Sequence, residues 1–94
     1  LISMTSGAGE DWYALSFISY AKPNDRAGFS LFARFLGRSM SRLFEARPHW
    51  GKVNYLNGEM LAGRHPCWED WWRVRDEIDP TATFLNEYMR SIRT

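Results

Sequence analysis

Apolar residues recur at helical spacing in the first half of the chain. Between Ala27 and Glu45 they stand three or four positions apart, at Phe29, Phe32, Leu36, Met40 and Leu43. This spacing predicts an amphipathic helix over 27–45. Opposite this face runs a row of arginines four residues apart, Arg34, Arg38 and Arg42. We expect that row to be the solvated face of the helix, with binding of phosphates or an anionic membrane as the less favoured alternative.

The second half carries shorter helical patterns. Pro66 suits a first helical position, and the apolar face that follows consists of Trp68, Trp71, Trp72 and Ile78. Asp79-Pro80 ends this helix. A further segment, Phe84 to Ile92, also has helical spacing, and Glu59 to Arg64 is long enough for one turn ending at Gly63. Together with the helix over 27–45, these patterns predict about three helices in the chain.

Two other segments favour extended structure. Trp12 to Tyr20 alternates apolar and mixed positions, which is typical of a strand, and Lys22-Pro23-Asn24-Asp25 breaks it. His49 to Leu56 is also expected to be extended, followed by a turn at Asn57-Gly58. The predicted fold class is therefore α+β, with short strands packed against the helices. Residues 1–10 are small and polar and are expected to form a flexible lead-in to a folded part over 11–94.

Length and charge narrow the class of protein. Ninety-four residues allow one small domain or part of a larger one. Twelve basic against eleven acidic side chains give a net charge of +1, too even for a dedicated nucleic-acid binder. The longest uncharged stretch lies between Asp11 and Lys22, far short of the roughly 20 apolar residues of a spanning helix. A single cysteine, Cys67, excludes an internal disulfide, and the presence of only two histidines argues against a complete metal-ligand set.

The candidate chemistry lies in Arg-Pro-His-Trp-Gly-Lys, residues 47–52. If this stretch is extended, His49 and Gly51 point one way and Trp50 and Lys52 the other. Lys52 offers a positive charge with three donors, Trp50 a stacking surface, and Gly51 space for a flat ring. The residue types alone indicate a small-molecule contact. They favour more strongly a plainer alternative, in which Trp50 is packed, Lys52 solvated and His49 hydrogen-bonded in the structure.

A resemblance to a known protein family changes the balance between these two interpretations of residues 47–52. His49-Trp50-Gly51-Lys52, then Asp79-Pro80 and Phe84-Leu85-Asn86-Glu87-Tyr88-Met89, resembles the C-terminal end of the aldonolactone oxidases. These are FAD enzymes of the vanillyl-alcohol-oxidase type and include D-arabinono-1,4-lactone oxidase, L-gulonolactone oxidase and the alditol oxidases. The similarity runs from about Trp12 to Arg93. It implies a C-terminal fragment of the substrate (cap) domain of a flavin oxidase.

The resemblance also implies roles for single residues. The lysine of the motif reaches the active site beside the isoalloxazine ring in relatives, which makes Lys52 the catalytic candidate. His49, Trp50 and Gly51 are expected to contact flavin or substrate. Many lactone oxidases have histidine two residues after the lysine, where this chain has Asn54. An amide keeps hydrogen-bonding capacity but cannot titrate near neutral pH. No metal is implied.

The implied cofactor is FAD, held in relatives mostly by an N-terminal domain that we expect to be absent from this chain. Gly7-Ala8-Gly9 is not followed by a helix at the spacing of a phosphate loop, so we expect the chain alone to hold FAD poorly and to be inactive.

The expected partners are the flavin-binding domain, a sugar lactone or polyol substrate, and a second copy through the aromatic surface. The alternative function is a non-catalytic interaction module or truncated remnant that binds a partner through its aromatic face. Substrate, electron acceptor and compartment, whether cytoplasmic or peripheral to a membrane, stay open.

Overall fold

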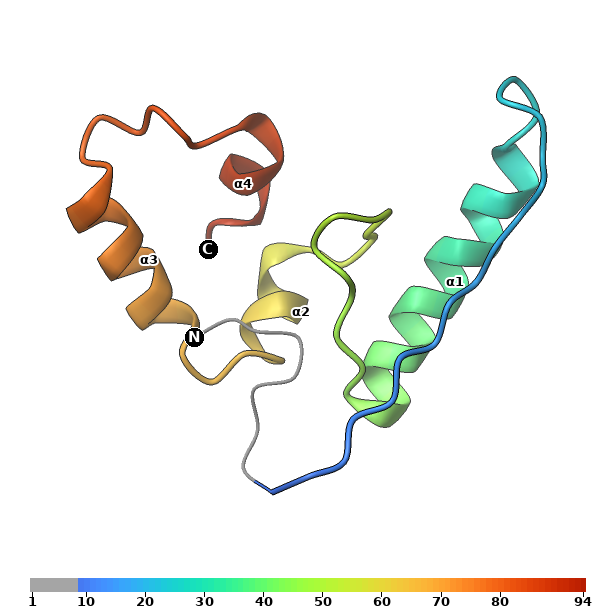
Figure 1. The fold of residues 1–94 in the computed structure, drawn as a ribbon, viewed down its shortest axis with the longest axis horizontal. Coiled ribbons are helices and arrows are strands. Elements are labelled where there is room, and N and C mark those ends of the chain that lie inside the picture. Colours follow the sequence, from blue (N-terminus) through green and yellow to red (C-terminus); the bar gives the residue numbers. More distant parts are fainter. Residues whose placement is uncertain (1–8) are drawn as a thin grey trace. The chain divides into compact units, whose positions relative to one another are not determined.

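A computed structural model describes residues 9–94, which form four helices (Figure 1). They divide into two compact units, whose described parts are residues 9–55 and residues 56–94. The first unit contains helix α1 (Ala27–Phe44), and the second contains α2 (Gly58–Ala62), α3 (Trp68–Ile78) and α4 (Glu87–Ile92). No strand occurs in 9–94. The predicted α+β class, with short strands, is therefore wrong, and the fold over these residues is helical.

The two predicted extended segments do not form strands. A strand is stable only when its backbone groups pair with a neighbouring strand. Residues 12–20 have no such neighbour among the residues that the structure describes, and their side chains reach into solvent, with Tyr13 85% and Tyr20 97% exposed. Residues 49–56 instead contain a turn over 50–51 and then irregular backbone. Most of the predicted lead-in, residues 1–8, lies outside the described residues.

Helix α1 confirms the predicted helix to within one residue. It begins at Ala27 and ends at Phe44, and Glu45 takes a left-handed conformation with φ of 56°. The backbone N–H groups of Glu45 and Ala46 both donate to the carbonyl of Met40, the latter at 3.3 Å. This closes the last turn and sends the chain away from the helix axis before Pro48 is reached.

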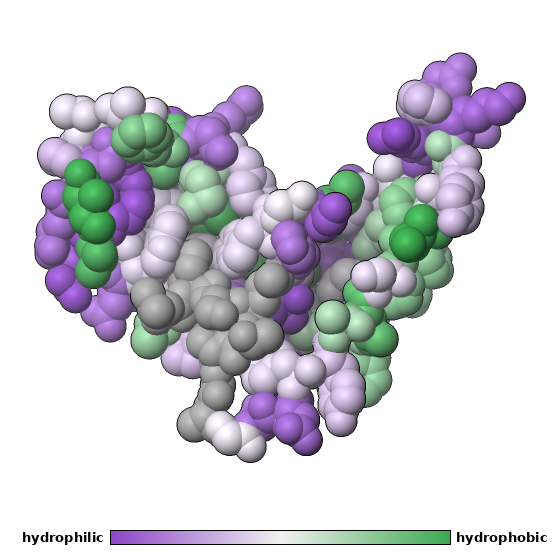
Figure 2. Space-filling view, viewed as in Figure 1, coloured by the Kyte–Doolittle hydropathy of each residue, from purple (hydrophilic) through white to green (hydrophobic). Residues whose placement is uncertain are grey.

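The unit of residues 9–55 has almost no apolar core. Phe29, Leu36 and Met40 are only half-buried. Large apolar side chains of this unit that face solvent are Tyr13, Leu15, Phe17, Ile18, Tyr20, Leu31, Phe32, Phe35, Leu43, Phe44 and Val53. Figure 2 shows apolar side chains lying open at the surface along α1. Such a surface is typical of a segment that packs against another part of a protein.

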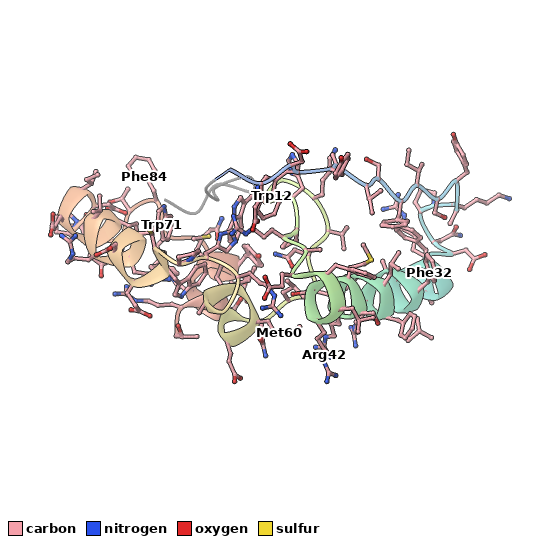
Figure 3. All side chains as sticks on the ribbon, turned by 90° about the horizontal axis from the view of Figure 1, so that it is seen from below. Trp12, Phe32, Arg42, Met60, Trp71 and Phe84 are labelled. Carbon is pink, nitrogen blue, oxygen red and sulfur yellow. The ribbon has the colours of Figure 1, made fainter. Side chains whose placement is uncertain are left out.

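The unit of residues 56–94 does have a core. Its large apolar side chains with at most 9% exposure are Leu56, Leu61, Trp68, Trp72, Leu85 and Ile92. Asn57 caps α2 by accepting the N–H of Met60 at 2.9 Å, so this residue begins a helix and not the predicted turn. Asn86 caps α4 in the same way, accepting the N–H of Met89 at 2.8 Å. Figure 3 shows Phe84 projecting from the loop before α4.

Contacts of α4 with α2 and α3 hold this unit together. A Cβ on Gly58 would lie 2.2 Å from the carbonyl oxygen of Ile92, so α2 and α4 meet with no room for a side chain. The guanidinium of Arg93 lies 5.1 Å from the centre of the Trp72 ring and pairs with Asp76. Trp72 in turn packs edge-on against Trp68, at 5.9 Å between ring centres. The predicted aromatic face of α3 therefore forms the core of this unit.

Asp79 fixes the loop between α3 and α4. Its carboxylate accepts the backbone N–H of Thr83 at 2.8 Å and of Phe84 at 3.0 Å, and Arg75 pairs with it at 2.5 Å. These contacts, that of Phe84 first, lower the pKa of Asp79. Arg93, followed by Arg75, lowers the pKa of Asp76. Both carboxylates thus favour the folded state when they are ionised.

We expect acid to destabilise residues 56–94 through these two carboxylates. A lowered folded-state pKa contributes stability that is complete above the unfolded-state value of 3.8 and is lost as pH falls through the folded values. Urea denaturation followed by tryptophan fluorescence should therefore show a falling midpoint from about pH 5 downward. Asp79→Asn should flatten this dependence. An unchanged pH profile in that variant would contradict the assignment.

Candidate functional site

The candidate residues lie in a tight turn. The backbone N–H of Lys52 donates to the carbonyl of His49 at 3.2 Å. The N–H of Gly51 donates to Nδ1 of the His49 ring at 3.0 Å. The expectation that His49 and Gly51 point to one side and Trp50 and Lys52 to the other is therefore wrong, because it assumed a strand. The turn brings His49, Gly51 and Lys52 together.

The imidazole of His49 has a defined orientation in this turn. Because Nδ1 accepts a hydrogen bond, the neutral ring carries its proton on Nε2. A Cβ at position 51 would lie 3.3 Å from Cε1 of the ring, so glycine gives the imidazole room to fold back on the backbone. The flat group that Gly51 accommodates here is the neighbouring histidine. His49 itself is exposed, which leaves Nε2 available as a donor.

The other candidates differ in exposure. Lys52 is exposed, so its ammonium is accessible to a ligand or to another part of a protein. Trp50 and Asn54 are half-buried. An accessible cation in the same turn as an oriented N–H donor suits the binding of a group that is negatively charged or becomes so during a reaction. The plainer alternative, in which Trp50 packs and Lys52 is solvated, is equally compatible with these exposures.

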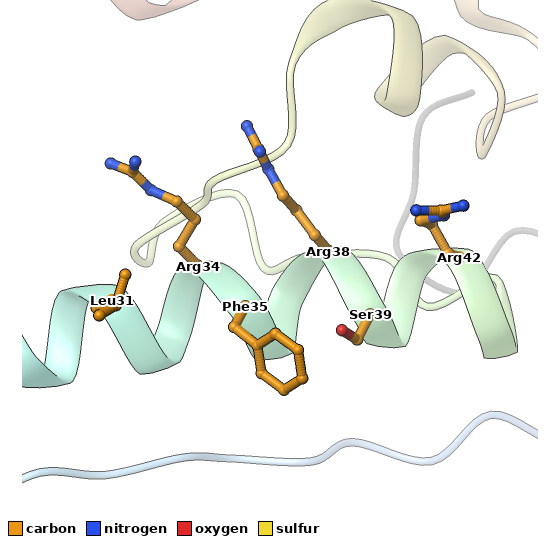
Figure 4. A pocket seen from close by; sticks show the side chains of 6 residues that line it. All are labelled: Leu31, Arg34, Phe35, Arg38, Ser39 and Arg42. Atoms are coloured by element: carbon orange, nitrogen blue, oxygen red, sulfur yellow. The ribbon is translucent and has the colours of Figure 1, made fainter.

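Sequence reasoning missed a contact between α1 and the end of this segment. The guanidinium of Arg34 lies 5.5 Å from the centre of the Tyr55 ring. Nε of Arg38, one turn later, donates to the backbone carbonyl of Tyr55 at 3.5 Å. Figure 4 shows both arginines, with Arg42, standing in a row on one side of α1. The row is exposed, as predicted, but two of its members also hold Tyr55.

A shallow hollow of about 360 Å³ lies along α1, next to the arginine row (Figure 4). The residues that line it all belong to this helix: Leu31, Arg34, Phe35, Arg38, Ser39 and Arg42.

Within residues 9–94, no three His, Cys, Asp or Glu side chains gather closely enough to hold a metal ion. None of the helices in the described part of the chain is both long and apolar enough to cross a lipid bilayer.

Comparison with known proteins identifies the family to which this chain belongs. Residues 13–92 match the D-arabinono-1,4-lactone oxidase family. The chain belongs to this family. The resemblance inferred from His49-Trp50-Gly51-Lys52 and from the segment Asp79 to Met89 is thereby confirmed. No solved structure matches the chain.

Named relatives place the match within longer proteins. A long-chain alcohol oxidase of an uncultured marine euryarchaeote is 59% identical over 92 residues, which cover 98% of this chain and 19% of that protein. An L-gulono-1,4-lactone dehydrogenase of Mycobacterium tuberculosis is 43% identical over 49 residues, 52% of this chain and 11% of that protein. An alditol oxidase of a Streptomyces species is 37% identical over 49 residues, 52% of this chain and 12% of that protein. The chain thus spans a fifth or less of these relatives.

Proposed function

We propose that this chain supplies the substrate- and flavin-contacting end of an FAD-dependent oxidoreductase that oxidises an aldonolactone or an alditol. Family membership and the exposed turn at His49, Gly51 and Lys52 support this proposal together. The observation that carries it is the accessible Lys52 ammonium in the same turn as a histidine whose Nδ1 accepts a hydrogen bond, which leaves Nε2 as the donor. The chain alone is inactive in this proposal, because the rest of the protein provides the flavin site.

Oxidation of an alcohol removes a proton from oxygen and a hydride from carbon. When bound, FAD supplies the acceptor for that hydride. Lys52 stabilises negative charge, either on the substrate oxygen as its proton leaves or at the N1–C2=O edge of the flavin. His49 donates through Nε2 to a substrate or flavin oxygen. Asn54 orients a polar group but takes no proton, since an amide does not titrate near neutral pH.

The residues that the structure describes fit one edge of FAD and not the whole cofactor. An exposed ammonium and an exposed imidazole within one turn suit the polar edge of an isoalloxazine ring. A glycine-rich turn at a helix N-terminus is a common way to bind dinucleotide phosphates. Helix α1 begins after Arg26, which makes no side-chain cap, and α3 begins after Cys67. We therefore assign the ring contacts to residues 49–52 and the phosphate contacts to the flavin-binding domain.

Replacing Lys52 by methionine in the complete protein tests this role. Methionine keeps most of the side-chain length and removes the charge. We expect turnover to fall roughly a hundredfold to a thousandfold, the usual effect of losing one stabilising group at a developing charge. The assay uses D-arabinono-1,4-lactone, L-gulono-1,4-lactone, xylitol and dodecan-1-ol in turn, and flavin absorbance checks that the cofactor content is unchanged.

The chain offers a matched control, because Lys22 is its one other lysine and is also exposed. Lys22→Met should leave turnover within a factor of two. Wild-type turnover in Lys52→Met, on a substrate that the complete protein oxidises, would defeat the assigned role.

The second candidate is a non-catalytic interaction module. The exposed apolar side chains of residues 9–55 favour it, since they offer a surface for a partner protein. Such a module has no need of the Lys52 charge. A complete protein that holds no flavin and oxidises none of the four substrates would favour this candidate over the oxidoreductase.

A further inference from the structure

The segment that carries the candidate turn leaves α1 and returns to it. It begins at Ala46, one residue beyond the C-cap Glu45, and reaches Tyr55 nine positions later. Both of its ends contact the same helix, and His49, Gly51 and Lys52 lie between them. A loop whose two ends are fixed on one rigid element restricts the positions that its middle residues can take.

The first end is held by the backbone. Ala46 donates its N–H to the carbonyl of Met40 at 3.3 Å, and Glu45 donates to the same carbonyl. The next residue, Arg47, places its guanidinium 4.5 Å from the centre of the Trp12 ring. This end therefore depends on the geometry of the helix terminus and needs no contact from the middle of α1.

The second end is held by two side chains of α1. Arg34 contacts the face of the Tyr55 ring, and Arg38 reaches the Tyr55 carbonyl. The two arginines are four residues apart, so they project from one side of the helix and meet a single residue with two different groups. Tyr55 is half-buried and stands three residues after Lys52. Fixing Tyr55 thus fixes the chain direction just beyond the lysine.

We propose that Arg34 and Arg38 are positioning residues, which hold Tyr55 and thereby set the place of Lys52. This inference rests on the proposed function for its catalytic consequence, although the contact itself is independent of it. The two arginines touch neither substrate nor cofactor in this account. Their effect passes through the backbone between Tyr55 and Lys52.

The test replaces both arginines by glutamine in the complete protein. We expect kcat on D-arabinono-1,4-lactone, or on whichever of the four substrates is oxidised, to fall roughly tenfold to a hundredfold, the range expected for a displaced catalytic group. KM and flavin content should change by less than a factor of three. The conservative variant with lysine at both positions keeps a cation over the ring and should recover part of kcat.

Arg42 provides the matched control, since it continues the same row one turn later and lines the same hollow. Arg42→Gln should leave kcat unchanged. If Arg42→Gln lowers kcat as much as the double variant does, the effect belongs to the charge of the helix and the proposal fails.

Amide hydrogen exchange separates this inference from the proposed function. In the double variant, the amide of Lys52 should exchange roughly tenfold faster, because its turn loses a fixed end. Unchanged exchange at Lys52 overturns the positioning role whatever happens to turnover. If the amide of Lys52 exchanges faster in the double variant while Lys52→Met keeps full turnover, the positioning role of Arg34 and Arg38 is supported and the proposed function fails.

Discussion

Replacing Gly58 by alanine is expected to cost residues 56–94 about 3 kcal/mol of folding free energy, at the upper end of the usual range for an overpacked site. The new methyl group would lie 2.2 Å from the carbonyl oxygen and 2.8 Å from the carbonyl carbon of Ile92. Both atoms belong to the backbone of α4, so they cannot rotate away as a side chain would. Either α2 or α4 must move, and Ile92 is itself buried with 2% exposure. Urea denaturation followed by tryptophan fluorescence measures the loss.

Two other glycines serve as controls for this prediction. A Cβ on Gly63 would approach nothing closer than 3.6 Å, and one on Gly37 would meet nothing within 4 Å in the described structure. Gly63→Ala should be close to neutral. Gly37→Ala should stabilise α1 by up to about 1 kcal/mol, because alanine favours the helix interior. A Gly58→Ala variant as stable as the Gly63→Ala variant would show that α2 and α4 do not meet as described.

The 94-residue chain, purified by itself, is expected to self-associate at micromolar concentration. Eleven large apolar side chains of residues 9–55 face solvent. At roughly 1.5–3 kcal/mol for each large side chain taken out of water, covering them contributes on the order of 20 kcal/mol. Association costs roughly 4–15 kcal/mol. Sedimentation velocity at several concentrations should show species larger than the 11.0 kDa monomer.

A pair of variants locates the surface responsible. Replacing Phe32 and Phe35 by serine should shift the distribution toward monomer. Replacing Phe84, which is 87% exposed but lies in the other unit, should change it less. The complete protein should not show this association if its remaining length covers the same face. A wild-type chain that stays monomeric throughout the concentration series would contradict the prediction.

The helices were largely predictable because their signals are local. The spacing of Phe29, Phe32, Leu36 and Met40 located α1 to within one residue. The helix expected over 84–92 is shorter, since Asn86 caps it and α4 begins only at Glu87. Pro66, expected at a first helical position, precedes α3 by two residues. Capping by asparagine and the turn before Trp68 decide these boundaries, and apolar spacing carries no information about either.

The strands were not predictable from alternation alone. Residues 12–20 have the pattern of a strand, but a pattern supplies no partner for backbone hydrogen bonds. The stretch around His49 failed for a more local reason. A glycine two residues after a histidine allows the ring nitrogen to bond the glycine N–H, and this contact folds the chain into a turn. The spacing His-x-Gly could have suggested that alternative.

The candidate site was found through resemblance and not through residue types. Family membership is confirmed, whereas the roles of His49, Trp50, Gly51, Lys52 and Asn54 stay predictions. The contacts of Tyr55 with Arg34 and Arg38 could not be read from the chain, because they join residues 17 or more positions apart. The four-residue spacing of the arginines indicated that they share one face of α1. It did not indicate which residue that face contacts.

The apolar core is concentrated in residues 56–94, while the lysine with the proposed chemical role lies in residues 9–55. The ribosome synthesises the lysine-bearing part first, although residues 9–55 have almost no apolar core to give that part lasting order. The amides of α2 and α3 should accordingly be the slowest to exchange in the separated chain. Those near Lys52 should exchange faster, because the unit that carries this lysine buries few apolar side chains.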